Sequence, residues 1–261
     1  MAYDKVVDSA LLDAGMTATA DAIRAKTGQT APVPWENANG FASAIAGIAT
    51  GGGGGENPLD YAIGLAYAFY GATFPSGTEL NVSFGDKAAM RSGYPNTNVL
   101  NNTFYGCTGV KSVKISSKLV FLSPYSMSNV FNACEDVETI DLTGMSQPLM
   151  LSAIDRGFRM CAVLKEILGE LDVSNCTNFS NCFANDSALE TISFKAGTIK
   201  KSIGLGQSSN LTDATIQNII DGLADLTGGT AQTLTLNKTV GAKLTDAQKA
   251  SASAKNWTIS Y

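Results

Sequence analysis

Cysteines are the first residues of this chain whose type and spacing could do chemistry. Cys107, Cys134 and Cys161 recur every 27 residues, so a repeating fold would bring their thiols within about 5 Å, the spacing of paired strands. That distance permits a disulfide, and three thiolates can bind a soft metal ion. A buried stack of small apolar thiols explains the spacing more simply, and it is the interpretation we favour.

Carboxylates offer the other route to catalysis, because two acids held about 5–9 Å apart can hydrolyse glycosides. The candidates lie on or near repeated segments: Glu138, Asp141, Glu166, Asp172 and Glu190. Lysines recur in the same segments, namely Lys111, Lys114, Lys165 and Lys195. Pairing of these opposite charges between neighbouring strands accounts for the acids without catalysis. We therefore expect no catalytic residue and no enzymatic activity, with glycan hydrolysis as the alternative.

The composition excludes several further classes of catalytic and metal-binding site. The chain has 261 residues and no histidine, which excludes Ser-His-Asp and Cys-His nucleophilic sites and histidine-based zinc or haem sites. Its five cysteines include no Cys-x-x-Cys pair, which argues against a disulfide scaffold or a zinc ribbon. A formal net charge of −5 argues against nucleic acid as a partner. We expect no metal and no cofactor.

Recognition is the remaining use for exposed side chains. Small polar residues on the outer face of strands suit a sugar or a protein, and tyrosines in turns stack on sugars or anchor a protein. The candidate binding residues are Tyr94, Tyr105, Lys114, Tyr125, Thr139, Asp141, Thr191 and Ser193.

An internal repeat must position these residues. Its four copies begin at Phe104, Phe131, Phe158 and Phe183, which are 27, 27 and 25 residues apart. In each copy a Cys or Asp and then spaced aliphatic residues follow the Phe. The aliphatic end predicts a short strand with alternating faces, and stacked copies predict a parallel sheet with Phe and Cys beneath it. The sequence therefore predicts an α/β solenoid.

Four regions follow from this pattern. Residues 1–50 predict a small helical module for attachment or oligomerisation, because their narrow apolar stripe requires a partner. Residues 51–57, with five consecutive glycines, predict a flexible linker. Residues 58–205 hold the solenoid, with 58–100 as its N-terminal cap or a degenerate copy. Residues 206–261 predict an α+β C-terminal cap.

The C-terminal region carries local signals for each of its elements. Thr212 predicts a helix N-terminus, and Gly228 its end. Residues 232–236 alternate as a strand, Thr245 and Gln248 form a capping-box pattern, and residues 257–261 predict a closing strand.

No segment predicts export or membrane insertion. The most apolar run, residues 61–72, is shorter than the roughly twenty residues of a membrane span. The first residues lack the basic and apolar stretches of a secretory signal. We expect no membrane span and a chain that folds in a reducing cytoplasm.

Three segments resemble known families. The Phe-x-x-Cys-x-x-Leu-x-x-Ile unit, over about 100–195, resembles the BspA-type leucine-rich repeat of bacterial adhesins and phage structural proteins. The stretch from Leu211 to Tyr261, with LTGGTAQTLTL and NWTISY, looks like the module that often follows such repeats. The opening, with MAYDKVVDSA and ADAIRAKTG, is similar to minor tail proteins of phages that infect Gram-positive hosts.

These resemblances imply a non-enzymatic phage tail or baseplate protein that presents a leucine-rich-repeat domain for adhesion to the host surface. They imply a location in the virion after synthesis in the host cytoplasm. The implied partners are a host cell-surface glycan or protein and, through residues 1–50, other tail or baseplate proteins. The N-terminal stripe predicts self-association, and the resemblance to phage tail proteins implies that the oligomer is a homotrimer. The alternatives are a glycan-degrading tail enzyme and a bacterial surface adhesin.

Overall fold

The computed structural model describes residues 64–84, 99–117, 119, 121, 123–179 and 181–261. The N-terminal part of this region forms seven strands: β1 (Thr73–Phe84), β2 (Thr108–Ser117), β3 (Tyr125–Ser126), β4 (Thr139–Gly144), β5 (Leu149–Ala153), β6 (Glu166–Asp172) and β7 (Thr191–Phe194). The C-terminal part adds β8 (Ile203–Leu205), α3 (Asp213–Gly222), β9 (Gln232–Leu236), α4 (Lys238–Gly241), α5 (Asp246–Ala254) and β10 (Trp257–Ser260).

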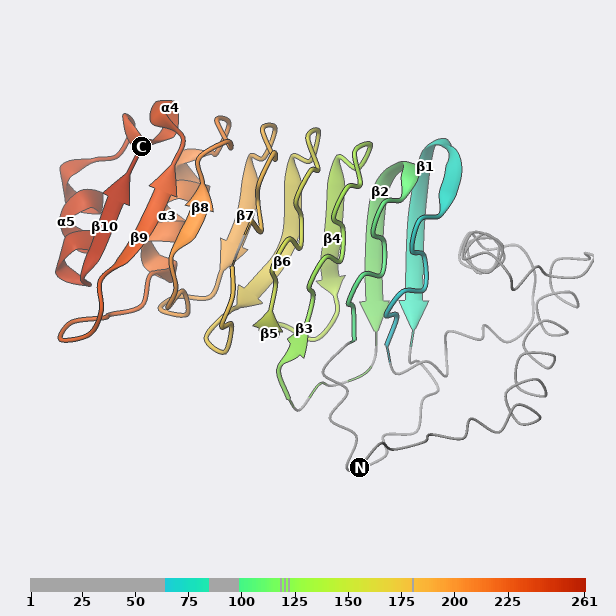
Figure 1. The fold of residues 1–261 in the computed structure, drawn as a ribbon, viewed down its shortest axis with the longest axis horizontal. Helices are drawn as coiled ribbons and strands as arrows, with labels where there is room; N and C mark the ends of the chain where they lie inside the picture. The colour runs from blue at the N-terminus through green and yellow to red at the C-terminus, as the bar shows by residue number, and fades with distance from the viewer. Residues whose placement is uncertain (1–63, 85–98, 118, 120, 122, 180) are drawn as a thin grey trace, which may run out of the picture.

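The first seven strands make one parallel sheet. Its order is β1-β2-β4-β6-β5-β3, and β7 also pairs with β6. The register keeps equivalent residues together, since Val113 lies opposite Ile140 and Ile140 lies opposite Ile167. The strands lie side by side along the long axis of the molecule (Figure 1), and their apolar residues face a common core.

The predicted α/β solenoid with a BspA-type leucine-rich-repeat domain is wrong. The described chain is an α/β fold whose main body is a parallel sheet curled as a half-barrel, and its three described helices all follow residue 212. The strands do not follow one another in chain order, because β5 and β3 extend the sheet beyond β6. A repeated apolar pattern specifies which residues face inward, but it does not distinguish a curled sheet from stacked coils.

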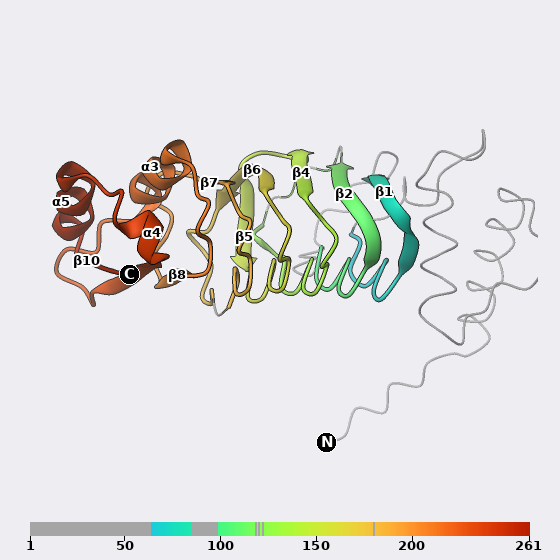
Figure 2. The same ribbon diagram turned by 90° about the horizontal axis from the view of Figure 1, so that it is seen from above.

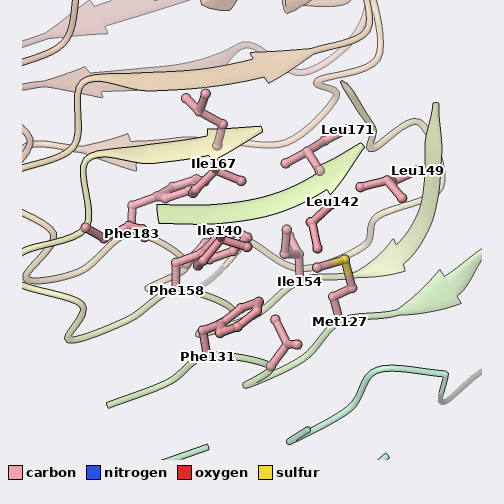
Figure 3. Packing of buried hydrophobic residues seen from close by; sticks show 14 of the residues in the cluster. Met127, Phe131, Ile140, Leu142, Leu149, Ile154, Phe158, Ile167, Leu171 and Phe183 are labelled. Carbon is pink, nitrogen blue, oxygen red and sulfur yellow. The ribbon is translucent and has the colours of Figure 1, made fainter. Parts of the chain in front are cut away.

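Aromatic rings fill the space beneath the sheet. Phe104 stacks on Phe131 with ring centroids 5.0 Å apart, and Phe131, Phe158 and Phe183 continue the stack at 6.0 and 5.7 Å. Figure 3 shows the last three rings beneath Ile140 and Ile167, whose strands lie above them. All six side chains are almost completely buried, so the repeated Phe positions provide the core beneath the sheet.

A fifth ring extends this stack toward the N-terminal end. Phe69 stacks on Phe104 with a centroid distance of 4.9 Å, although its spacing of 35 residues breaks the repeat. β1 confirms the alternating strand expected around Leu80–Phe84. Residues 64–84 thus contribute a turn and a strand equivalent to those of the repeats.

The C-terminal region confirms most local signals. The Thr212 hydroxyl accepts a hydrogen bond from the Thr215 N–H at the start of α3, and Thr245 and Gln248 form both bonds of the capping box of α5. β9 spans residues 232–236 as predicted. The predicted end of the first helix at Gly228 is wrong, because α3 ends at Gly222.

A second, three-stranded parallel sheet completes this region in the order β10-β9-β8. Figure 2 shows α3 and α5 along one side of it. The Trp257 indole is buried and donates to the Ala224 carbonyl oxygen over 2.9 Å.

The predicted helical module of residues 1–50 and linker of residues 51–57 lie outside the described residues. None of the described helices has the length and hydrophobicity that a membrane span requires.

Candidate binding surface

Five turns, each next to one of the stacked phenylalanines, form a continuous hydrogen-bonded surface. We call residues 67–71, 102–106, 129–133, 156–160 and 181–185 the turn stack. Successive turns are joined by hydrogen bonds between their backbones. The N–H groups of Phe69, Phe104 and Phe131 donate to the backbone carbonyl oxygens of Thr103, Val130 and Gly157, respectively, each over 2.8 Å. The Phe158 N–H donates to Cys182 over 3.0 Å. Side chains at equivalent positions therefore lie in rows across the turns.

The first residue of every turn has a left-handed backbone conformation, with φ between 51° and 61°. The residues of this row are Tyr67, Asn102, Asn129, Arg156 and Asn181. Asparagine tolerates this conformation because its short side chain bonds locally, whereas a bulky side chain is strained there. The last residues of the turns have positive φ as well: Gly71, Gly106, Ala133, Met160 and Asn185.

Three tyrosines gather at the N-terminal end of the turn stack. Tyr70 and Tyr105 stack with ring centroids 4.9 Å apart and an angle of 8° between the rings. Tyr67 lies 5.9 Å from Tyr70 at a tilt of 37°. Tyr67 is 61% exposed and Tyr70 37% exposed, so the cluster presents aromatic surface to solvent.

Two arginines lie in the fourth turn. Arg156 is exposed and Arg159 half-buried, and the Arg159 N–H donates to the Arg156 carbonyl oxygen. Arg159 occupies the position that Tyr70 and Tyr105 hold in the first two turns. Within the described residues, neither guanidinium has an ion pair or a hydrogen bond, so both are available to a ligand.

We call the solvent-facing side of β2, β4, β6 and β7 the strand face. It brings together five of the residues expected to bind a ligand, namely Lys114, Thr139, Asp141, Thr191 and Ser193. Thr139 and Thr191 each lie opposite Glu166 in the register, which places all three in one row. Lys114 lies opposite Asp141, and Ser193 lies opposite Glu170. All five are exposed or half-buried, as expected for a solvent-facing surface.

Ion pairs between neighbouring strands hold three of the acids that were candidates for catalysis. Lys114 lies 2.9 Å from Asp141, Lys165 lies 2.9 Å from Glu138, and Lys195 lies 2.8 Å from Asp172. This confirms the expected pairing of acids with lysines. Because the ammonium groups are about half exposed, solvent screens each pair, and its contribution to stability is small.

The same pairs lower the pKa values of the acids. The hydrogen bond and charge of Lys165 hold the pKa of Glu138 below its usual value. Burial would raise the pKa of Asp141, but hydrogen bonds from Thr143 and Lys114 bring it below its usual value. Lys195 and Ser174 do the same for Asp172 against its burial. These three groups are therefore ionised near neutral pH and do not act as general acids.

Two of the predicted tyrosines do not contribute to an exposed surface. Tyr125 is only 1% exposed and lies in β3, which pairs with β5 at the end of the sheet, so its prediction as an exposed binding residue is wrong. Burial raises the pKa of its hydroxyl far above the usual value. Tyr94 lies outside the described residues. Tyr105 is half-buried and belongs to the tyrosine cluster.

The cysteines form the buried row of free thiols that the simpler interpretation predicted. The thiols of Cys107, Cys134 and Cys161 donate to the carbonyl oxygens of Phe69, Phe104 and Phe131, respectively. Burial raises the pKa values of Cys134 and Cys161 well above the usual value. The described residues contain no cluster of His, Cys, Asp or Glu suited to a metal ion.

Asp186 takes the place of the cysteine in the last repeat. Its carboxyl group is fully buried, Oδ1 accepts from the Cys161 N–H over 3.0 Å, and Oδ2 has no partner. Burial raises its pKa to about 8, against the opposing effect of the Cys161 N–H. The carboxyl group is thus largely protonated at neutral pH, and it is closed off from solvent.

The turn stack is the surface that the sequence pattern did not reveal. Tyr67, Tyr70 and both arginines were not among the predicted residues, because the repeat was read from its inward-facing positions. The signal that could have found them is the row of asparagines before the phenylalanines, at positions 102, 129 and 181, which Tyr67 and Arg156 interrupt.

Comparison with known proteins gave no match: no family model, no curated protein and no solved structure is similar to this chain.

Proposed function

We propose that this chain is a non-enzymatic binding protein of a phage tail or baseplate, which adheres to a polysaccharide on the host surface. The observation that supports it most is the exposed cluster of Tyr67, Tyr70 and Tyr105 on the turn stack. The place in a virion rests on the similarity of the opening residues to minor tail proteins.

Tyrosine suits this task because each ring combines an apolar face with a hydroxyl group that can form hydrogen bonds. The mutual stacking of Tyr70 and Tyr105 restricts their rotamers before a ligand arrives, which lowers the entropy cost of binding. Asn102 and Asn129 add amide groups, which can bond to sugar hydroxyls, in the same and the next turn.

The carboxylates support binding over hydrolysis. A glycosidase requires an accessible acid with a raised pKa beside a second carboxylate. Here Glu138, Asp141 and Asp172 have lowered pKa values and lysine partners, and Asp186, whose pKa is raised, is fully buried.

Binding of the full-length protein to host cells and to polysaccharides purified from their surface tests the proposal. The test variant is Tyr70→Asn/Tyr105→Asn, because the next turn has Asn132 at the equivalent position and the fold accepts asparagine there. We expect it to lose about tenfold or more in affinity, the effect of removing aromatic anchors from an interface. The matched variant Thr139→Ala/Thr191→Ala alters the strand face and should bind like the wild type.

Three results would contradict this assignment. Loss of binding in the strand-face variant alone would move the site to the residues predicted from the sequence. Binding to a surface protein and not to purified polysaccharide would make the ligand a protein, and release of reducing sugars would make the chain an enzyme.

A further inference from the structure

We propose that Arg156 and Arg159 form an anion-binding site on the turn stack, so that the bound polysaccharide carries carboxylate or phosphate groups. This inference rests on the proposed function and names the chemical class of its ligand. It depends on three features of the fourth turn: a strained backbone position, two guanidinium groups without an ion pair or hydrogen bond to any described residue, and a short path to the tyrosine cluster.

Arg156 occupies its position against the local conformational preference. Its φ of 51° places it in the left-handed region, where Asn102, Asn129 and Asn181 stand in the equivalent turns. Arginine has no short side-chain oxygen to stabilise this conformation, so the arginine costs free energy that an asparagine would save. Strained positions of this kind cluster at functional sites, and a cationic side chain here points to an anionic ligand.

Among the described residues, the two guanidinium groups have no carboxylate partner, unlike three of the lysines. Lys114, Lys165 and Lys195 each bind a carboxylate of a neighbouring strand. The nearest acid in sequence, Asp155, instead accepts a hydrogen bond from the Ser128 hydroxyl of the adjacent turn. With no internal partner among the described residues, the planar donor arrays of both arginines remain open to bidentate contacts with a carboxylate or phosphate.

The site is continuous with the tyrosine cluster. The turn that contains Tyr105 is hydrogen-bonded to the next turn, because the Gly106 N–H donates to the Asn132 carbonyl oxygen over 2.8 Å. That turn is hydrogen-bonded to the turn of the arginines, because the Ala133 N–H donates to the Arg159 carbonyl oxygen, also over 2.8 Å. Two such steps separate Tyr105 from Arg159, or about 10 Å at the usual spacing of bonded strands. One polysaccharide chain can therefore place a sugar ring on the tyrosines and an anionic substituent on the arginines.

The test uses full-length protein on an array of neutral, carboxylated and phosphodiester-containing polysaccharides, at about 50 mM and 500 mM salt. The test variant is Arg156→Asn/Arg159→Asn, which adopts the residues found at these positions in the preceding turn, Asn129 and Asn132. The control, Lys200→Gln/Lys201→Gln, removes the same charge from exposed positions outside the turn stack.

We expect the wild type and the lysine control to bind charged polysaccharides, and the arginine variant to lose about tenfold or more in affinity at low salt. Whether the bound members are carboxylated or phosphorylated identifies the anionic group. Binding confined to neutral members, or equal loss in the lysine control, would overturn the anion site and leave the proposed function intact. Failure of the wild type to bind any polysaccharide, while it still binds host cells, would overturn both.

Discussion

Asp186 shows how one residue can replace another in a buried row by changing its protonation state. The cysteines of the row donate to Phe carbonyl oxygens, whereas the Asp186 carboxyl group accepts from the Cys161 N–H and its Oδ2 has no partner. A neutral Asp186 therefore fits a position that an ionised aspartate would destabilise, since its Oδ2 has no partner that offsets a charge.

This protonation makes stability depend on pH. The pKa of the Asp186 carboxyl group is about 8 in the folded protein, well above the ordinary aspartate value of 3.8 that applies in the unfolded chain. The folded state thus holds the proton more tightly, and the free energy of unfolding should fall as pH rises from about 4 to about 8, with a slope of up to about 1.4 kcal/mol per pH unit. Urea unfolding at pH 4.5, 6 and 7.5 measures this slope.

Asp186→Asn removes the titrating group at almost constant volume, and the variant should show a flatter dependence over the same range. An equal slope in wild type and variant would mean that other groups cause it. The lowered pKa values of Glu138, Asp141 and Asp172 act in the opposite sense, because their stabilisation is lost as pH falls through the lowered values.

At the scale of the element, the left-handed first residue of each turn affects the stability of the fold. Tyr67→Asn and Arg156→Asn each place asparagine in a left-handed position that asparagine occupies in three other turns. Each variant should therefore be more stable than the wild type by about 0.5–1 kcal/mol, because the strain of a bulky residue is relieved. Thermal unfolding followed by calorimetry measures the change.

Asn129→Ala is the matched control, since it takes the favourable residue away from the same row and should lower stability by a similar amount. If the two asparagine variants gain stability and lose ligand binding, the strain serves function. A loss of stability in both would show that Tyr67 and Arg156 pack usefully where they are.

Gly109 illustrates how a strand is held close to its neighbour. Its φ is 79°, and a Cβ atom at this position would collide with the backbone carbonyl of Phe74, where β1 bulges against the start of β2. Gly109→Ala should therefore destabilise the protein by about 3 kcal/mol or more. Gly228 has the same φ but open space around it, so Gly228→Ala should cost only about 1 kcal/mol. Urea unfolding of both variants separates the collision from the backbone strain.

Local signals in the sequence predicted much of this structure because they act over a few residues. The capping box at Thr245 and the alternating strand of residues 232–236 depend only on near neighbours, and both are confirmed. The inward-facing Phe and Cys positions followed from burial. The order of the strands did not, because β5 and β3 pair through contacts between distant segments.

The binding residues were harder to predict, because their exposure depends on features that the hydrophobic pattern does not report. Tyr125 lies outside the Phe-to-Ile motif from which the inward-facing positions were read, so that motif did not indicate that it faces the core. Tyr67 and Arg156 depend on backbone conformations that hydrophobic spacing does not report. The strand-face residues were placed on the correct side because their alternation with buried residues is regular, as at Thr139, Ile140 and Asp141.

At the scale of the whole molecule, a deletion tests the prediction that residues 1–50 mediate oligomerisation while residues 58–261 bind the host. The curled sheet and the C-terminal region share one continuous core of buried residues, so a fragment of residues 58–261 should fold as a monomer that still binds host cells. Sedimentation of this fragment beside the full chain measures the association state. A full chain that sediments as a monomer would contradict the homotrimer, and an unfolded fragment would contradict the modular organisation.

The arrangement of the strands along the long axis has a mechanical consequence. The hydrogen bonds between strands run along this axis (Figure 1), so a pull between the two ends of the molecule loads them lengthwise, one strand pair after another. Strands under such a load separate in sequence, and each 27-residue unit that opens releases about 90 Å of extended chain. A particle tethered through this protein would therefore be held by a link that lengthens stepwise under load before it detaches.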